Sequence, residues 1–265
     1  MPLFFLKLGG SAVTDKTREA TPRPDVIRRA AREVRGALDS RPALRLLLGH
    51  GSGSFGHFAA QRSGFGKPGA WQAYAETAAA AARLDRIVTD IFLEENIPVV
   101  SLQPSASARC RDGELVSLEV DPIRNALEHG LVPLIYGDVA LDETRGMSIA
   151  STEKLFAFLV PLFRPARLVY VSEAGGIFTA DPLLDPTAAL IPEITPARFP
   201  AFEPGVGGSR GFDVTGGMID KVRRSLGLAS RFPDLDIFVV GAGEGVVERA
   251  LTEPRFLDGT HIHAG

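Results

Sequence analysis

Two short apolar segments near the N-terminus each run directly into a glycine-rich stretch, and this repeated arrangement constrains the fold more than any other feature. Leu3 to Leu8 is followed by Gly9-Gly10-Ser11, and Leu44 to Leu48 is followed by the stretch from Gly49 to His57. Continuous apolar runs of this length are typical of strands buried in a parallel sheet. Between them, from Pro24 onward, apolar residues recur at spacings of three and four, which predicts a helix. The N-terminal part is therefore a strand, helix, strand unit with a glycine-rich loop after each strand.

The rest of the chain alternates between strand and helix patterns in the same way. Hairpins are predicted around residues 111–113 and 142–146, helices at 71–95, 122–129, 217–230, 246–251 and from 151 onward, and strands at 97–102, 132–136, 168–171, 237–240 and 260–262. Such alternation predicts an α/β fold with a mainly parallel central sheet covered on both faces, and ligands bind such sheets at the carboxyl ends of the strands. Since no internal repeat is visible, we expect residues 1–265 to form a single domain.

Composition and charge exclude several classes of protein. The chain of 265 residues has 29 Lys+Arg and 32 Asp+Glu, so its net charge of −3 does not favour binding to nucleic acid or to an acidic membrane surface. The single cysteine, Cys110, cannot form an intrachain disulfide, which suits a reducing cytoplasm. The apolar run before Lys7 is too short for a signal peptide or a membrane span. We therefore expect a cytoplasmic protein with no nucleic-acid or membrane partner.

The second glycine-rich stretch formally matches the dinucleotide-binding fingerprint, as Gly51-x-Gly53-x-x-Gly56. A true fingerprint opens directly into a helix and is followed about twenty residues later by an acidic residue at the end of a strand. Here helix-breaking residues follow, and Glu76 falls within the predicted helix at 71–95. The Walker A pattern is absent from the sequence. Both a nicotinamide or flavin protein and a P-loop enzyme are therefore disfavoured.

Phosphate handling is the interpretation that the two loops favour. Each loop offers backbone N–H groups, Lys7 lies beside the first loop, and Lys16 lies just beyond it. Backbone donors next to lysines suit phosphoryl oxygens, because phosphoryl transfer needs charge stabilisation and alignment more than covalent help. Two such loops facing one cleft would hold a donor phosphate and an acceptor phosphate.

Three segments are similar to those of a known family, namely Lys7 to Lys16, His50 to His57 and Asp213 to Lys221. Over its whole length the chain resembles the amino acid kinase superfamily, and within it the isopentenyl phosphate kinases. The resemblance implies an open three-layer αβα sandwich, with an acceptor-binding lobe at about 1–165 and a nucleotide-binding lobe at about 166–265. It implies a kinase of isoprenoid biosynthesis in the mevalonate pathway, commonly a homodimer, which uses ATP and Mg²⁺ to convert isopentenyl monophosphate into isopentenyl diphosphate.

The resemblance also assigns roles to particular residues. Catalysis falls to Lys7, Lys16 and His57, with Lys16 stabilising the transferring group and His57 binding the acceptor phosphate. The residues expected to bind ATP are Lys7, Gly9, Gly10, Ser11, Gly53, Glu173, Asp181, Gly217 and Lys221. The residues expected to bind the acceptor are Ser52, Gly53, His57 and Thr152. No metal-binding residue is assigned, because Mg²⁺ would lie between nucleotide phosphates with few protein ligands.

Two positions depart from the family pattern. Family members usually have three consecutive glycines where this chain has Gly51-Ser52-Gly53. If Ser52 needs a positive φ, its side chain costs roughly 1 kcal/mol or more. Many members have Ser-Gly-Asp-Asp where this chain has Ser151-Thr152-Glu153-Lys154, so the role of Glu153 stays open between Mg²⁺ and backbone positioning.

Plainer roles also fit several of these residues. Lys16 is also consistent with an ordinary solvated loop. For His50, a role in fixing the geometry of the loop is favoured over a role in catalysis. The pair His261 and His263 fits a solvated or strand-edge position better than a metal site, because no Cys, Asp or Glu stands beside it at ligand spacing. An apolar wall for the prenyl tail is expected on the helical face formed by Trp71, Tyr74, Ala75 and Ala78.

Other functions stay open beside the expected one. A kinase of the same fold could act on an amino-acid carboxylate, a carbamate or a phosphonate, and a non-catalytic protein could bind ATP as a sensor. The expected chemistry is in-line attack of an acceptor phosphate oxygen on the γ-phosphorus of ATP. A phosphate monoester, with a second pKa of about 6, is mostly dianionic at neutral pH, so no strong general base is needed.

Overall fold

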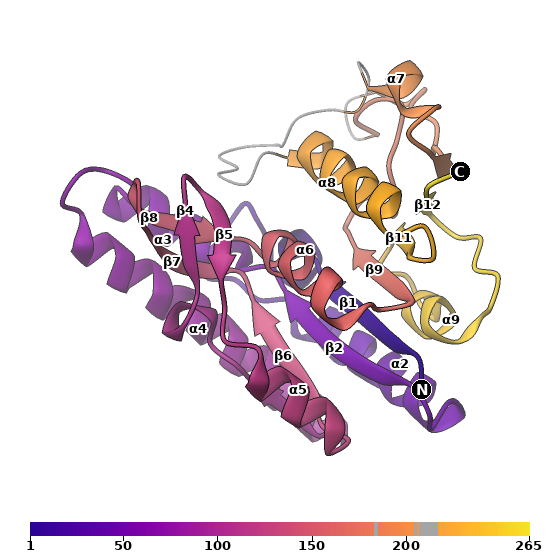
Figure 1. Ribbon diagram of the computed structural model, residues 1–265, viewed down its shortest axis with the longest axis horizontal. Coiled ribbons are helices and arrows are strands. Elements are labelled where there is room, and N and C mark those ends of the chain that lie inside the picture. Colours follow the sequence, from indigo (N-terminus) through magenta and orange to yellow (C-terminus); the bar gives the residue numbers. More distant parts are fainter. Residues whose placement is uncertain (183–184, 204–205, 207–216) are drawn as a thin grey trace.

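The apolar run at the N-terminus forms strand β1 (Leu3–Leu8), in which every residue is buried. It pairs in parallel with β2 (Arg45–His50) on one side and with β9 (Arg167–Val171) on the other. In the computed structural model, which describes residues 1–182, 185–203, 206 and 217–265, these strands belong to an eight-stranded sheet with the order β10-β12-β11-β9-β1-β2-β6-β3 (Figure 1). The strand that carries the first glycine-rich segment therefore lies inside the sheet.

The other strands of this sheet are short and mostly parallel to β1. They are β3 (Val99–Ser101), β6 (Val132–Tyr136), β10 (Glu193–Ile194), β11 (Asp236–Val240) and β12 (Thr260–Ile262). Within the described residues, the antiparallel pair of this sheet is β11 with β12. The prediction of a mainly parallel central sheet is confirmed.

Helices cover both faces of the sheet. Successive side chains of β1 point to opposite faces, so Phe4, Leu6 and Leu8 pack in one apolar cluster and Leu3 and Phe5 in the other. The first cluster is closed by α1 (Gly10–Val13), α2 (Pro24–Ser40), α3 (Gly53–Ser63), α4 (Trp71–Glu94) and α9 (Val246–Thr252). The second is closed by α5 (Asp121–Glu128), α6 (Thr152–Phe163), α7 (Phe199–Phe202) and α8 (Gly217–Arg231). These are the three layers of the expected αβα sandwich.

A smaller sheet lies beyond the end of β6 in the view of Figure 1. Its strands are β4 (Arg109–Arg111), β5 (Glu114–Ser117), β7 (Asp138–Asp142) and β8 (Gly146–Ala150), in the order β5-β4-β7-β8. The 3-10 turn η1 (Pro104–Ala106) leads from β3 into it. Both hairpins predicted from the sequence are present.

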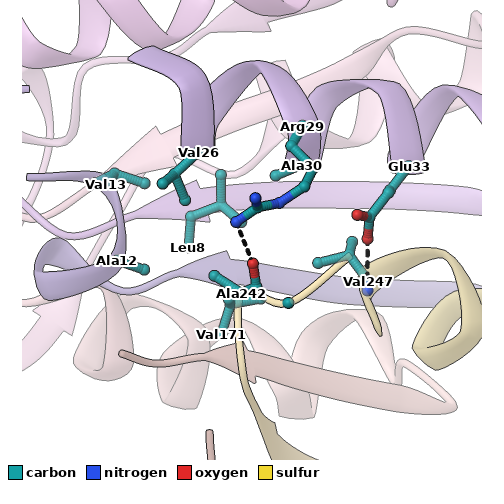
Figure 2. Close-up of a pocket in the computed structure, with 11 residues that line it drawn as sticks. Leu8, Ala12, Val13, Val26, Arg29, Ala30, Glu33, Val171, Ala242 and Val247 are labelled. Carbon is teal, nitrogen blue, oxygen red and sulfur yellow. Dashed lines mark hydrogen bonds between the residues drawn. The ribbon is translucent and has the colours of Figure 1, made fainter. Parts of the chain in front are cut away.

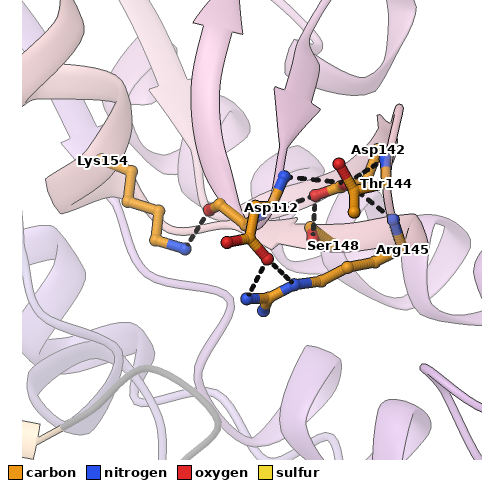
Figure 3. A network of polar contacts seen from close by, with 7 residues as sticks. Asp112, Asp142, Thr144, Arg145, Ser148 and Lys154 are labelled. Carbon is orange, nitrogen blue, oxygen red and sulfur yellow. Dashed lines mark hydrogen bonds and ion pairs between the residues drawn. The ribbon is translucent and has the colours of Figure 1, made fainter.

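One buried carboxylate, Asp142, joins the two hairpin turns of this sheet (Figure 3). It accepts the N–H of Gly113 at 2.7 Å, those of Thr144 and Arg145 at 2.9 Å, and the hydroxyl of Ser148 at 2.6 Å. Burial raises the pKa of Asp142, but these four donors outweigh it and hold that pKa well below its usual range. The tips of both hairpins are thereby fixed as one unit.

The second glycine-rich stretch was predicted to be a loop, followed by helix-breaking residues that prevent a continuous helix. The structure corrects this prediction. Helix α3 starts within that stretch, at Gly53, and runs for 11 residues before Gly64 ends it. Gly64 adopts a left-handed conformation there, with φ 73°, and donates its N–H to the carbonyls of Ala60 and Gln61. The breakers at 64–69 therefore terminate a helix that has already formed. None of the helices in the described ranges is long and apolar enough to cross a membrane.

Candidate active site

The two glycine-rich segments meet backbone against backbone at the carboxyl ends of β1 and β2. A Cβ atom on Gly10 would lie 2.8 Å from the Cα of Gly53, and one on Gly51 would lie 2.8 Å from the nitrogen of Gly10. A Cβ atom on Gly9 would lie 2.5 Å from the carbonyl oxygen of Val171 at the end of β9. Side chains cannot occupy such positions, so glycine is required for the three strand ends to converge. The structure thus brings the two predicted phosphate loops to one place.

A buried threonine that the sequence analysis did not single out, Thr14, joins the two segments. Its hydroxyl donates to the carbonyl of Gly10 at 2.7 Å and accepts the N–H of Ser54 at 2.9 Å. This bond satisfies one of the donors that the start of α3 leaves without an intrahelical partner. The other N–H groups at the start of a helix favour anions, and the helix dipole adds to that preference. The start of α3 is therefore suited to a phosphate group.

Ser52 adopts an ordinary right-handed conformation, with φ −67° and ψ −10°. The positive φ falls instead on Gly53, at 51°, where the family also has glycine. The penalty expected for a side chain at Ser52 therefore does not arise. Space for that side chain comes from Gly56, because a Cβ atom on Gly56 would lie 2.4 Å from the Ser52 Oγ.

A cluster of two lysines and one carboxylate stands beside the loops. Lys7, which is buried on β1, places its Nζ 2.7 Å from the Glu153 Oε1, and the Nζ of Lys221 on α8 lies 3.8 Å from the same oxygen. Burial alone raises the pKa of Glu153, but the ammonium groups of Lys7 and Lys221 outweigh it and lower that pKa to about 2. Glu153 is therefore ionised at neutral pH and holds two of the lysines predicted to bind ATP.

Glu153 owes its position to the start of helix α6. Ser151 is the N-cap of this helix, and its side chain accepts the N–H of Lys154 at 3.3 Å. A carboxylate in the first helical turn also interacts favourably with the helix dipole. Within the described residues, no group of three or more His, Cys, Asp or Glu side chains is arranged to hold a metal ion. In the structure, the side chain of Glu153 contacts Lys7 and Lys221.

Ser52 and His57 lie together in the wall of one cavity. Its other lining residues are small, apolar or buried, and they are Gly56, Ala60, Thr77, Ala81, Gly137, Asp138 and Ile149. Burial raises the pKa of the Asp138 carboxyl, although that group accepts the backbone N–H of Ser105 and of Val139. The cavity lining therefore combines the polar side chains of Ser52, His57, Thr77 and Asp138 with small or aliphatic residues.

The face of α4 expected to form the apolar wall is placed differently. Among the described residues that line the cavity, α4 contributes Thr77 and Ala81. Trp71 is 54% exposed and its ring packs at an angle on Tyr74, while Ala75 is also exposed. The sequence of α4 does not indicate which face of the helix turns inward, because alanines occupy positions on every side of it.

The remaining predicted residues occupy varied surroundings. Lys16 is exposed in a turn after Thr14, and Glu173 pairs with Arg23 at 3.0 Å just after β9. Thr152 is buried and donates its hydroxyl hydrogen to the carbonyl of His50 at 2.6 Å. The backbone carbonyl of Asp181 accepts the N–H of residue 185, and Gly217 starts α8. The preceding part of the third family segment, 213–216, lies outside the described residues.

A second, mainly apolar cavity lies on the α2 side of the first loop (Figure 2). Its polar side chains already have partners, since Arg29 donates to the carbonyl of Ala242 and Glu33 accepts the N–H of Gly245 and of Val247 at 2.8 Å. Its other lining residues are aliphatic or small. These bonds attach α2 to the segment between β11 and α9, which is a structural role.

Comparison with known proteins shows similarity over nearly the whole chain. A sequence profile of the amino acid kinase family matches residues 2–240. The isopentenyl phosphate kinase of Methanothermobacter thermautotrophicus is 34% identical, covering 94% of this chain and 95% of that protein. The isopentenyl phosphate kinase of Haloferax volcanii is 36% identical, and the match covers 94% of this chain and 99% of that protein. A solved isopentenyl phosphate kinase structure superimposes with a TM-score of 0.83 at 31% identity, covering 98% of this chain and 99% of that one.

Proposed function

Because this chain belongs to the amino acid kinase family and, within it, to the isopentenyl phosphate kinases, we propose that it transfers the γ-phosphoryl group of ATP to isopentenyl monophosphate. The predicted fold and the predicted membership of this family are confirmed. The observation that supports the substrate assignment is that Ser52 and His57 line one cavity together with the small or aliphatic residues Ala60, Ala81 and Ile149. A short prenyl monophosphate likewise combines an anionic head with an apolar tail.

The chain's own residues would act mainly by offsetting charge. Two phosphate groups must approach each other, so the site needs donors and cations more than a general base. The N–H groups at the start of α3 and the imidazole of His57 would bind the acceptor phosphate. Lys7 and Lys221, held by Glu153, would bind the nucleotide phosphates, and Lys16 would stabilise the transferring group.

We propose that the enzyme uses Mg²⁺ together with ATP, and that the protein would supply few ligands to the ion. The carboxylate beside the loops, Glu153, is held by two lysines, so its charge is already balanced. The ion would neutralise charge on the phosphate oxygens. We also propose a cytoplasmic homodimer, on the strength of the family resemblance, and light scattering coupled to size exclusion tests the dimer.

The decisive experiment measures ADP release with Mg·ATP and a panel of acceptors. The panel contains isopentenyl phosphate, dimethylallyl phosphate, glutamate, carbamate and fosfomycin. We expect turnover of the prenyl monophosphates. Faster turnover of glutamate, carbamate or fosfomycin would instead assign another kinase activity, and ATP binding without turnover of any acceptor would support a sensor.

A paired substitution tests the role of His57. His57→Ala removes a donor to a charged group, which is worth about 1.5–3 kcal/mol, so kcat/KM for isopentenyl phosphate should fall about 10- to 150-fold. The matched control is His129→Ala, because His129 is exposed at the end of α5 and its ring bonds the carbonyl of Asn125 one helical turn earlier. Full activity of His57→Ala would exclude its assigned role.

A further inference from the structure

His50 is buried beneath the second loop, and both of its ring nitrogens face hydrogen-bond acceptors. Its Nδ1 lies 3.0 Å from the carbonyl oxygen of Gly51, and its Nε2 lies 3.2 Å from the Asp85 Oδ1. Asp85 is also buried, and its other oxygen accepts the hydroxyl of Ser101 at 2.5 Å. A chain of contacts thus runs from Ser101 on β3 through Asp85 on α4 to the Gly51 carbonyl.

The surroundings fix the orientation of this ring and place a hydrogen on its Nδ1. A carbonyl oxygen can only accept, so the hydrogen between His50 and Gly51 is on Nδ1. The ring stacks on Tyr136 with a centroid distance of 5.6 Å and an interplanar angle of 11°. The His50 carbonyl is also held, because it accepts the N–H of Gly137 at 2.9 Å and the hydroxyl of Thr152 at 2.6 Å.

Holding the Gly51 carbonyl has a consequence on the opposite side of the peptide. In a trans peptide the C=O of residue 51 and the N–H of Ser52 point in opposite directions. The carbonyl points to the His50 ring, so the Ser52 N–H points away from that ring. A Cβ atom on Gly137 would lie 3.3 Å from the Ser52 nitrogen, and Gly137 lines the same cavity as Ser52 and His57. A side chain at Gly137 would therefore crowd this N–H, and glycine leaves the space beside it open.

We propose that His50 and Asp85 are positioning residues for phosphoryl transfer, which hold the Gly51 carbonyl so that the Ser52 N–H points at the acceptor phosphate. Asp85 fixes the imidazole, the imidazole fixes the carbonyl, and the planar peptide transmits that orientation to the N–H. Neither side chain needs to touch the substrate. This inference rests on the proposed function, because it assumes an acceptor that carries a phosphate.

Substitutions at Asp85 separate a positioning role from a role in stability. Asp85→Ala removes the contact, so the KM for isopentenyl phosphate should rise about tenfold or more while the KM for ATP stays within about twofold. Asp85→Asn should rescue the acceptor KM to within about threefold of wild type. Its amide can donate to Nε2 of a neutral His50 and still accept the Ser101 hydroxyl.

A control variant measures the effect of losing any buried carboxylate. Asp142→Ala removes the carboxylate that joins the two hairpin turns in Figure 3. It should lower the midpoint of urea unfolding and leave both KM values unchanged for the folded fraction. If Asp85→Ala behaves like Asp142→Ala, with no rise specific to the acceptor KM, the proposal is wrong.

Binding measurements on the wild-type protein distinguish a failure of this inference from a failure of the proposed function. In a ¹H–¹⁵N NMR titration with isopentenyl phosphate and no ATP, the Ser52 amide proton should shift downfield on saturation. An acceptor that binds without moving the Ser52 resonance overturns the positioning proposal. Failure of the proposed function has a different signature, because isopentenyl phosphate would then neither bind nor be turned over.

Discussion

Lys7 on β1 and Glu153 on α6 form a partly buried ion pair across 146 residues of sequence, with the lysine Nζ 2.7 Å from the Glu153 Oε1. Lys221 on α8 approaches the same oxygen to 3.8 Å. One carboxylate therefore sets the positions of two ammonium groups that come from opposite halves of the chain. It also offsets their mutual repulsion, which would otherwise be considerable in a partly buried site.

Replacing Glu153 by Gln should damage both stability and nucleotide use. Lys7 would keep its burial and lose its counter-charge, and breaking a buried pair in this way costs about 3–5 kcal/mol. We expect urea unfolding to show a loss of that order, together with a rise in the KM for ATP. The matched control is Glu114→Gln, because the pair of Glu114 with Arg224 is largely exposed and should contribute less than about 1 kcal/mol.

The ion pair also predicts how stability depends on pH. The pKa of Glu153 is about 2 in the folded protein, against an ordinary value of 4.5. A carboxyl group whose pKa is lower in the folded state stabilises that state at pH values above its unfolded-state pKa. This contribution is lost as the pH falls through the folded-state pKa. The stability difference between wild type and Glu153→Gln should therefore be constant above about pH 5 and shrink by roughly 3 kcal/mol between pH 5 and 2. Urea unfolding at several pH values measures it, and a difference that grows towards low pH would contradict the assignment.

Substitution of Lys16 tests whether this residue acts in catalysis but contributes little to stability. Its side chain is exposed in a turn, so Lys16→Ala should change the free energy of unfolding by less than about 0.5 kcal/mol. If Lys16 stabilises the transferring phosphoryl group, kcat should still fall by about 100-fold or more. Lys67→Ala, at another exposed lysine, is the control and should retain wild-type kcat. Equal activity of both variants would assign Lys16 to the solvated loop instead.

The order of strands and helices was predictable because it depends on local patterns. The start of α4 at Trp71 and the N-cap at Ser151 agree with the sequence patterns to the residue. The start of α3 was missed because Gly53 has low helix propensity, which the bond from Ser54 to Thr14 helps to override. Local propensity carries no information about that bond, whose two residues are 40 positions apart.

The site was predictable only as far as parallel topology determines it. Strand ends of a parallel sheet share one edge, so the meeting of the two glycine-rich segments followed from the sequence. The partner of Glu153 and the link from Asp85 to His50 did not, because each depends on how a helix is rotated against the sheet. Which residues of α4 face the cavity that contains Ser52 and His57 was not predictable for the same reason.

The close approach of the two loops predicts that Gly10→Ala inactivates the protein. The new Cβ atom would lie 2.8 Å from backbone atoms of Gly53, which cannot move without displacing the start of α3. We expect a large loss of kcat with either substrate saturating. Gly227→Ala is the control, since no described residue outside its own helix lies within 4 Å of the added Cβ atom, and it should stabilise α8 by up to about 1 kcal/mol. Wild-type kinetics for Gly10→Ala would show that the loops do not need this contact.

The pairing of Ser52 with Gly56 predicts non-additive behaviour that is specific to this chain. A Cβ atom on Gly56 would lie 2.4 Å from the Oγ and 2.6 Å from the Cβ of Ser52, and no other atom of the described residues limits that space. Gly56→Ala alone should therefore displace Ser52 and raise the acceptor KM. Ser52→Gly removes both clashing atoms, so in that background Gly56→Ala should change the acceptor KM by less than about twofold. A double-mutant cycle on the acceptor KM and on the free energy of unfolding measures the coupling. Additive effects would mean that Gly56 is required for a reason other than the serine.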